Sequence, residues 1–363
     1  MRVKLEDVCE RGSSNIKQSD IIKMSGNYPV YGASGLAGKV NFYHQKQPYV
    51  AVVKDGAGIG RTTLNPAKSS VIGTMQYLIP KKNVLPEYLF YVVSYMHLEK
   101  YYTGATIPHI YFKDYKNEEF NLDNIEKQLE IIDALGRCKK VIEARKQELV
   151  ELDRLTKARF VEMFGDYINE GGKPLSELAT ITGGLTKNSK RNTFNLKMPY
   201  LRVANVFFNR LDLNEILEIG VREDEIGKTL LEAGDLLFVE GNGSIEQIGR
   251  VAIWDGSINQ ILHQNHLIKA RFHKKTILPE YALFYFMSQE GRQQIISKSV
   301  STSGLNTLSV NKISSLILPM PPIELQERFA AFVTQVNKSK VAVQKALDET
   351  QILFDSLMQK YFG

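Results

Sequence analysis

The residue types that could do chemistry form no complete catalytic pattern in this sequence. A glycine-rich run at residues 56–60, Gly-Ala-Gly-Ile-Gly, invites comparison with nucleotide-binding loops. It fails the dinucleotide template, because Arg61 stands where a glycine is required and no helix of the right pattern follows. No G-x-x-x-x-G-K-[ST] run for holding ATP phosphates occurs either. We therefore predict no nucleotide site of these kinds.

Other polar residues also lack the spacing of a catalytic or metal site. The run Asn-Pro-Ala-Lys at residues 65–68 lacks the second proline and the aromatic residue with which amino-methyltransferases hold a flipped base. The six histidines form no H-E-x-x-H pattern, and His263 and His266 lie in an apolar strand context. Cys9 and Cys138 belong to no C-x-x-C motif, which predicts a reducing compartment and no zinc site. No Ser/His/Asp arrangement can be assembled, so we predict a recognition protein without a catalytic site.

The elements that must position the polar residues are organised around one stretch that occurs twice. Residues 125–165 align without a gap with residues 323–363, from Ile-Glu-x-Gln at the start to Phe-Gly at the end. Neither copy contains proline. A helix of this length spans about 60 Å, so it must bury its apolar residues against another helix. The interruptions in the two apolar seams are complementary, which favours antiparallel packing. A core helix of an ordinary bundle is the alternative.

The segments that precede the two long helices have mixed strand and helix patterns. In each, an apolar run (residues 48–53 and 234–239) leads into a glycine-rich loop that ends in Ile-Gly-Arg, at Arg61 and Arg250. Residues 71–80 are predicted to form one further strand. Each segment then has a Pro-Glu-Tyr helix start, since proline suits the first turn.

The predicted fold class is therefore α+β. Two mixed α/β domains form a tandem pseudo-repeat, each is followed by a long helix, and the two helices pack as an antiparallel coiled coil. The predicted boundaries are 1–122 for the first domain, 123–165 for the first helix, 166–320 for the second domain and 321–363 for the second helix.

Composition is that of an ordinary globular protein with a mild basic excess. The formal net charge is +6 and the pI is about 9.0, which is compatible with a polyanionic partner without requiring one. No run of eighteen apolar residues predicts a membrane span. The first residues lack the apolar segment of a signal peptide, so we expect a cytoplasmic protein.

These motifs together resemble the specificity subunit of type I restriction–modification systems. The resemblance covers essentially the whole chain. It depends on Gly-Asp-Leu-Leu-Phe at 234–238, Ile-Gly-Arg at 248–250, Gln-Asn-His at 264–266, Pro-Glu-Tyr at 279–281 and the proline-rich helix start at 318–326. The first half departs from the pattern in two places. Asn-Leu-Asp-Asn at 121–124 stands where the prolines would be, and Thr74-Met75-Gln76 is taken as the counterpart of Gln264-Asn265-His266.

The resemblance implies a division of labour within a complex. Each variable domain would be a target recognition domain that reads one half of a split double-stranded DNA sequence, and the helices would set the spacing. Two modification subunits, which bind S-adenosylmethionine and methylate adenine, would dock on the chain. Restriction subunits, which use ATP and Mg²⁺, would join them. The specificity subunit itself would be non-catalytic and would hold no cofactor.

Candidate DNA contacts follow from the chemistry of base edges and phosphates. Arginine suits guanine, Asn and Gln suit adenine, and Lys or Arg to phosphate positions the protein without specifying sequence. The candidates are Lys54, Arg61, Thr106, His109, Lys187, Lys190, Arg191, Arg202, Asn205, Asn242, Gln247, Arg250 and Asn306.

Each candidate has a structural alternative. Arg61 and Arg250 recur in both halves, which favours a scaffold or phosphate role, and residues 184–191 could be a solvated loop. Residues 264–266 could cap strands or satisfy buried backbone. Two other functions also stay open, an enzyme that acts alone and a protein-binding scaffold without a DNA role.

Overall fold

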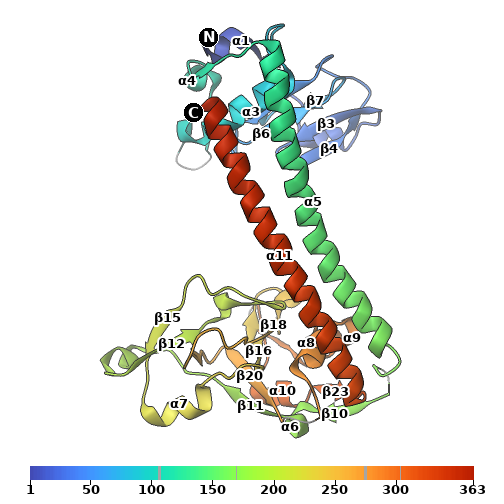
Figure 1. Ribbon diagram of the computed structural model, residues 1–363, viewed down its shortest axis with the longest axis vertical. Coiled ribbons are helices and arrows are strands. Elements are labelled where there is room, and N and C mark those ends of the chain that lie inside the picture. Colours follow the sequence, from blue (N-terminus) through green and yellow to red (C-terminus); the bar gives the residue numbers. More distant parts are fainter. Residues whose placement is uncertain (105–107, 169, 274–275, 303) are drawn as a thin grey trace. The chain divides into compact units, whose positions relative to one another are not determined.

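The structure is a computed structural model that describes residues 1–104, 108–168, 170–273, 276–302 and 304–363 (Figure 1). The chain divides into two compact units. Unit 1 comprises Met1–Gln147 with Val343–Gly363, and unit 2 comprises Glu148–Ala342. Two long helices, α5 (Ile125–Phe164) and α11 (Ile323–Phe362), each contribute to both units. Each unit therefore contains the start of one long helix and the end of the other.

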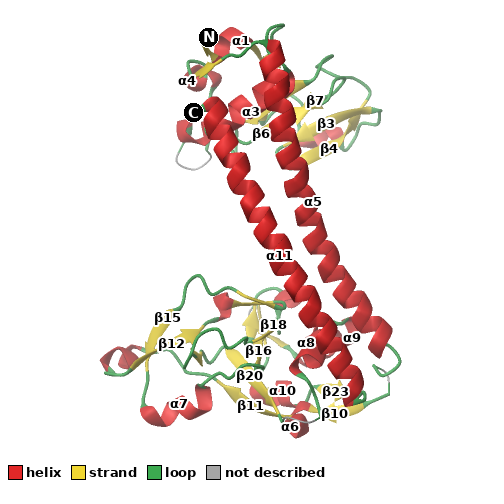
Figure 2. Ribbon diagram, viewed as in Figure 1, coloured by secondary structure: helices red, strands yellow, loops and turns green. Residues whose placement is uncertain are grey.

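The described part of unit 1 is built on three small sheets with short helices around them (Figure 2). The largest is antiparallel, in the order β2 (Cys9–Ser13), β8 (Met75–Pro80), β5 (Tyr49–Val53), β6 (Thr62–Asn65). The second has the order β4 (Gly35–Val40), β3 (Tyr28–Gly32), β7 (Ser70–Val71), in which β3 and β7 are parallel. The third pairs β1 (Arg2–Lys4) with β9 (Glu119–Asn121). The helices are α1 (Leu5–Val8), α2 (Gln18–Ile21), α3 (Pro86–Tyr95), η1 (Leu98–Tyr101) and α4 (Phe112–Tyr115).

Unit 2 repeats these three sheets with the same pairing. They are β11 (Ala179–Gly183), β20 (Leu267–Phe272), β16 (Leu236–Val239), β18 (Val251–Ile253); β15 (Leu217–Gly220), β12 (Lys197–Leu201), β19 (Leu262–His263); and β10 (Gly172–Pro174) with β23 (Ile317–Pro319). As in unit 1, the second sheet has one parallel pair, β12 with β19.

Two further sheets and the connecting helices complete the described part of unit 2. The sheets are β13 (Val206–Phe207) with β14 (Arg210–Leu211), and β17 (Gly241–Asn242), β22 (Leu305–Thr307), β21 (Val300–Thr302). The helices are α6 (Leu175–Leu178), η2 (Ser189–Thr193), η3 (Val203–Asn205), α7 (Glu223–Thr229), η4 (Ile245–Gln247), α8 (Pro279–Met287), α9 (Gln289–Lys298) and α10 (Val310–Ser314).

The central strands are continuously apolar because both of their faces are covered. Along β5, Val50 and Val52 face the core shared with α3, whereas Ala51 and Val53 face the core beneath the second sheet. Successive side chains of a strand point to opposite faces, so a strand between two cores needs apolar residues at every position. Strand β16 is divided in the same way between two cores of unit 2.

Within each unit the two long helices run antiparallel. In unit 2, Lys340 of α11 pairs with Asp153 of α5, and the Phe329 and Phe160 rings are 5.5 Å apart. In unit 1, Met358 of α11 packs in the same core as Ile131 of α5. The predicted fold class, with its antiparallel helix pair, is confirmed. The two compact units divide the chain within both long helices, between Gln147 and Glu148 and between Ala342 and Val343. This division does not test the four predicted domain boundaries, which stay a prediction.

A buried glutamine ties the start of each long helix to its own unit. The amide oxygen of Gln128 accepts the N–H of Leu85 at 2.8 Å, and its nitrogen donates to the carbonyls of Asn83 and Asp123. Gln326 makes the equivalent three bonds, to Leu278, Thr276 and Pro321. Both glutamines are fully buried. This clamp explains why the Ile-Glu-x-Gln pattern occurs twice.

Two details of the sequence prediction were wrong. Residues 71–80 form two strands, β7 and β8, because the chain turns at 72–74 to pass between sheets. The expected alignment of Thr74-Met75-Gln76 with residues 264–266 is wrong by two positions. The carbonyl of Thr74 accepts the N–H of Lys54, and the carbonyl of His266 accepts the N–H of Glu240 at the same point of the scaffold. Thr74 is therefore the counterpart of His266.

Candidate nucleic-acid interface

In unit 1, two loops bring three polar side chains together at the end of β5. Asp55 follows the strand and forms a β-bridge with His109. The His109 Nδ1 atom lies 2.7 Å from the Asp55 carboxylate, and the Lys54 ammonium lies 3.6 Å from the same carboxylate. The side chains of Lys54 and His109 are 29% and 36% exposed. The predicted candidates Lys54 and His109 therefore share one partly exposed cluster, and Thr106 lies outside the described residues.

Unit 2 has a polar cluster on the equivalent two loops, one residue pair further from the strand. Asn242 in β17 pairs with Asn306 in β22. The Asn306 amide is 8% exposed and donates to the carbonyls of Asn242 and Gly243, both at 3.3 Å. The Asn242 side chain accepts the N–H of Ser244 at 2.9 Å, which makes an Asx turn. Asn306 thus holds the loop in place, while Asn242 and Gln247 are half-buried on it.

The arginine of the repeated Ile-Gly-Arg motif makes the same hydrogen bond in both units. Arg61 donates to the carbonyl of Ala33 at 3.0 Å, and Arg250 donates to the carbonyl of Val203 at 3.3 Å. Ala33 and Val203 occupy equivalent positions, two residues beyond the last residue of the parallel strand pair. The shared bond supports the scaffold interpretation of both arginines. Arg61 is exposed, whereas burial lowers the pKa of Arg250.

The glycine of that motif is required by the backbone. Gly60 has φ +81° and Gly249 has φ +62°, both in the left-handed region that favours glycine. A Cβ at Gly60 would lie 2.6 Å from the backbone nitrogen of Glu99, and one at Gly249 would lie 2.4 Å from the Ile295 side chain. The glycine and the arginine therefore recur together because they fix one turn of the scaffold.

The basic loop of unit 2 divides into one buried and two exposed cations. Arg191 is 8% exposed and donates to Glu225 at 2.9 Å and to the carbonyl of Gly220 at 3.0 Å. These hydrogen bonds from Arg191 hold the pKa of Glu225 below its ordinary value. Lys187 and Lys190 are exposed, and Lys187 and Arg191 line a cavity of about 330 Å³. Arg191 therefore shapes the loop from which the two lysines project.

Arg202 and Asn205 are also engaged within unit 2. The Arg202 guanidinium, 22% exposed, lies 2.6 Å from the Glu215 carboxylate. Asn205 is 3% exposed, accepts the N–H of Arg202 and donates to the carbonyls of Asp212 and Glu215. Asn205 thus closes the segment that follows β12, and its polar atoms are already used.

A cation–aromatic cluster on the β13–β14 hairpin escaped the sequence prediction. The Phe207 ring has the guanidinium of Arg210 at 4.4 Å and that of Arg250 at 5.1 Å. Arg292 lies 5.0 Å from the neighbouring Phe208 ring. The signal in the sequence was the run Phe-Phe-Asn-Arg at 207–210, since asparagine tolerates the positive φ that Asn209 adopts.

The described residues hold no group of three or more His, Cys, Asp and Glu side chains that could bind a metal ion. His263 is fully buried, its Nδ1 lies 2.8 Å from the carbonyl of Thr229, and burial lowers its pKa to about 4. Among the described helices, none is both long and apolar enough to cross a membrane.

The fold and these clusters define a duplicated binding protein, in which one scaffold presents different polar loops at equivalent places. The family model of the type I restriction modification DNA specificity domain matches residues 1–154 and 172–350. The chain belongs to this family.

Relatives and solved structures agree with that assignment. The EcoKI specificity subunit of Escherichia coli K12 is 31% identical over 196 residues, which cover 52% of this chain and 41% of that protein. A putative MjaX specificity subunit of Methanocaldococcus jannaschii is 28% identical over 188 residues, 51% of this chain and 43% of that protein. The aligned part thus spans less than half of either relative. The S subunit structure from M. genitalium is 14% identical with a TM-score of 0.61, covering 100% of this chain and 96% of that one.

Proposed function

We propose that this chain is the DNA sequence-specificity subunit of a type I restriction–modification complex. Two target recognition domains, residues 1–122 and 166–320, each contact one half of a bipartite double-stranded DNA target. The long helices set the spacing between the halves. The observation that carries the proposal is the pair of polar clusters on equivalent loops at a strand end, with Lys54, Asp55 and His109 in one unit and Asn242 and Asn306 in the other.

A duplicated scaffold with different polar side chains on equivalent loops suits two readers of different half-sites. Asparagine can form two hydrogen bonds with adenine, whereas a lysine or histidine prefers acceptors such as guanine or phosphate oxygens. The accessible candidates are the proposed contacts: Lys54, Arg61, His109, Lys187, Lys190, Asn242 and Gln247. Arg191, Arg202, Asn205, Arg250 and Asn306 each make hydrogen bonds within the unit, so we assign them positioning roles.

The chain contributes recognition, and its partners contribute the reactions. Modification subunits, two per chain, bind S-adenosylmethionine and methylate adenine. Restriction subunits use ATP and Mg²⁺. The absence of a phosphate loop from the sequence supports this division. The complex acts in the cytoplasm, where its DNA substrate is found.

Domain exchange tests the two-reader proposal directly. Residues 1–120 are replaced by the corresponding domain of another family member, and the chimaera is expressed with its modification subunit. Methylome sequencing of the host should then show a change in one half of the methylated motif, with the other half and the spacing retained. An unchanged motif would contradict the proposal, and so would an isolated chain that binds S-adenosylmethionine tightly.

A second experiment tests the helices as the spacing element. One helical turn inserted near Val150 in α5, with a matched insertion in α11, lengthens both helices together. The methylated motif should keep its two halves and change the number of bases between them. The same spacing in an intact complex would refute this role for the helices.

A further inference from the structure

The outermost strand of the main sheet is covered in unit 2. Strand β18 is the last of its sheet, and the β13–β14 hairpin lies against it, with the N–H of Asn209 donating to the carbonyl of Val251 at 2.9 Å. Val251 and Ala252 are buried. The hairpin belongs to residues 202–216, which connect β12 to β15. Unit 2 thus protects its sheet edge with its own chain.

The equivalent strand of unit 1 has no such hairpin over it. Only Ala33 and Ser34 separate β3 from β4, the counterparts of β12 and β15. Strand β6 is the last of its sheet in the described structure, and Thr62 takes the place of Val251 in the pairing register. Leu64 on this strand is 39% exposed. An uncovered strand edge can pair with an added strand from another chain.

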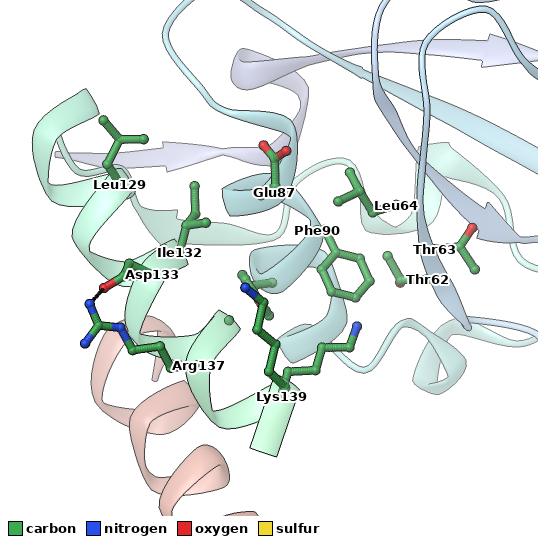
Figure 3. A pocket seen from close by; sticks show the side chains of 13 residues that line it. Thr62, Thr63, Leu64, Glu87, Phe90, Leu129, Ile132, Asp133, Arg137 and Lys139 are labelled. Carbon is green, nitrogen blue, oxygen red and sulfur yellow. Dashed lines mark ion pairs between the residues drawn. The ribbon is translucent and has the colours of Figure 1, made fainter. Parts of the chain in front are cut away.

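A groove runs beside this edge and is lined by β6, α3 and α5 (Figure 3). Its volume is about 820 Å³, with Leu64 on one side, Leu129 and Ile132 on the other and Phe90 between them. Leu129 is 54% exposed. At the two positions of Leu129 and Ile132, the repeated helix α11 has Glu327 and Ala330. The apolar lining is therefore particular to α5, although the two helices are copies of one element.

The charges around the two grooves differ in a way that indicates the occupant. In unit 2, Asp255 and Glu280 line the groove together with Arg210 of the hairpin, so an acidic wall meets a basic occupant. In unit 1, Glu87 stands at the place of Glu280, and Asp133 forms an ion pair with Arg137. Lys139 and Lys140 add two positive charges that leave the lining basic, and Lys139 lies 4.8 Å from the Phe90 ring. The α11 helix has asparagine at the position of Lys139. An occupant of the unit 1 groove should therefore carry acidic side chains.

We propose that the β6 edge and its groove receive an extended segment of a modification subunit. A backbone N–H of that segment donates to the carbonyl of Thr62, as Asn209 does to Val251 in unit 2. Aliphatic side chains of the segment pack on Leu64 and Leu129, and a carboxylate faces Lys139. This inference rests on the proposed function, because the partner is taken from it.

The test uses the full chain and the purified modification subunit. Hydrogen exchange of the wild-type complex should show new amide protection at residues 62–65. The double variant Leu64→Glu/Leu129→Glu places carboxylates in the groove. It should weaken one of the two modification-subunit sites by about 30-fold or more, as expected for an interface hot spot, and leave the other unchanged in calorimetry. Leu36→Glu, at a 59% exposed leucine of β4 outside the groove, is the matched control and should bind like the wild type.

The outcomes separate this inference from the function on which it rests. A wild-type complex in which residues 62–65 gain no protection, or in which the double variant binds two modification subunits as the wild type does, overturns the inference alone. Protection of β6 by self-association of the chain identifies a second copy as the occupant and overturns it too. A wild-type chain that binds no modification subunit overturns the proposed function as well.

Discussion

The two units share a scaffold and differ in what is attached to it. Three sheets, with one parallel pair in the second, recur with the same register, as does the arginine bond to a carbonyl beyond that pair. Unit 2 adds the 202–216 insertion and a three-stranded sheet where unit 1 has two isolated bridges at His109. Recurring residues therefore fix the backbone, and residues that differ are free to serve recognition.

This comparison sorts the candidate residues better than residue type does. Arg61 and Arg250 suit guanine by type, yet they make the same internal bond in both units. Gly241 and Thr307 stand at the positions of Asp55 and His109, and the Asn242–Asn306 pair lies one residue pair further from the strand on the same two loops. Exchanging side chains between equivalent positions thus separates scaffold from readout.

The largest expected effect concerns an ion pair between η2 and α7 of unit 2. Glu225→Gln removes the charge that compensates buried Arg191, and Arg191 then keeps a positive charge with too few partners. Breaking such a pair from one side costs about 3–5 kcal/mol. Urea unfolding followed by a probe in unit 2 should show this loss.

Glu223→Gln is the matched control in the same first turn of α7. Glu223 is exposed, so its variant should lie within about 0.5 kcal/mol of the wild type. Equal unfolding midpoints for the two variants would contradict a structural role for the Arg191–Glu225 pair.

A second prediction concerns a buried histidine with no counterpart in unit 1. His263 occupies the position of Val71, and burial lowers its pKa to about 4. Below pH 6.5 the unfolded chain takes up a proton that the folded chain refuses, so the free energy of unfolding falls as pH decreases toward 4. The loss is roughly 3 kcal/mol at 1.36 kcal/mol per pH unit.

His263→Val gives unit 2 the residue of unit 1 and should flatten this pH dependence. Chemical denaturation at pH 7, 6, 5 and 4.5 measures the slope. Asp235 and Lys269 are the nearest charges, so the difference between variant and wild-type slopes, and not either slope alone, is the test. Parallel slopes would show that His263 is protonated in the folded chain.

Much of the fold followed from sequence because the same signals occur twice. The two helices begin at Ile125 and Ile323 and end at Phe164 and Phe362, where the aligned copies place them. Apolar runs without alternation correctly indicated strands between two cores. The start of each long helix could also be predicted, because the glutamine at its fourth position recurs. This buried glutamine makes hydrogen bonds to the chain of its own unit.

The features that the sequence analysis did not predict depend on contacts between distant segments. Arg191 looked like a loop cation, and only the packing of α7 against η2 shows that Glu225 neutralises it. The hairpin at 206–211 was missed because its strands are two residues long. The displacement at Thr74 arose because a turn between sheets has no repeated motif to anchor an alignment. The sequence shows which side chains are charged or polar, but it does not show which of them pair with other groups of the chain.

The glutamine clamps test whether the two units are equivalent in energy as well as in geometry. Gln128→Leu and Gln326→Leu each remove three hydrogen bonds and leave a buried backbone N–H unpaired. Each should cost about 1–3 kcal/mol. Hydrogen exchange, read separately in the two units, should give losses that agree within about 0.5 kcal/mol.

Gln359→Leu serves as the control, because this glutamine is exposed on α11 and should be close to neutral. A loss of stability in one unit only would show that the equivalent hydrogen bonds contribute differently to the stability of the two units. In that case, the duplication would be geometric without being energetic.

The smallest expected effects come from the paired arginines, and here the two units should differ. Arg250→Ala removes a bond to Val203 and stacking on Phe207, at a cost of about 1–2 kcal/mol. Arg61→Ala removes one exposed bond and should cost about 0.5 kcal/mol or less.

DNA binding by the assembled complex then decides whether exposed Arg61 has a second task. A phosphate contact predicts weaker binding to every sequence and a salt dependence reduced by about one unit of slope. A base contact predicts lost discrimination at one position of the half-site read by unit 1, with the salt slope nearly unchanged. Wild-type affinity, specificity and salt dependence in Arg61→Ala would leave the bond to Ala33 as its whole function and would remove Arg61 from the proposed contacts.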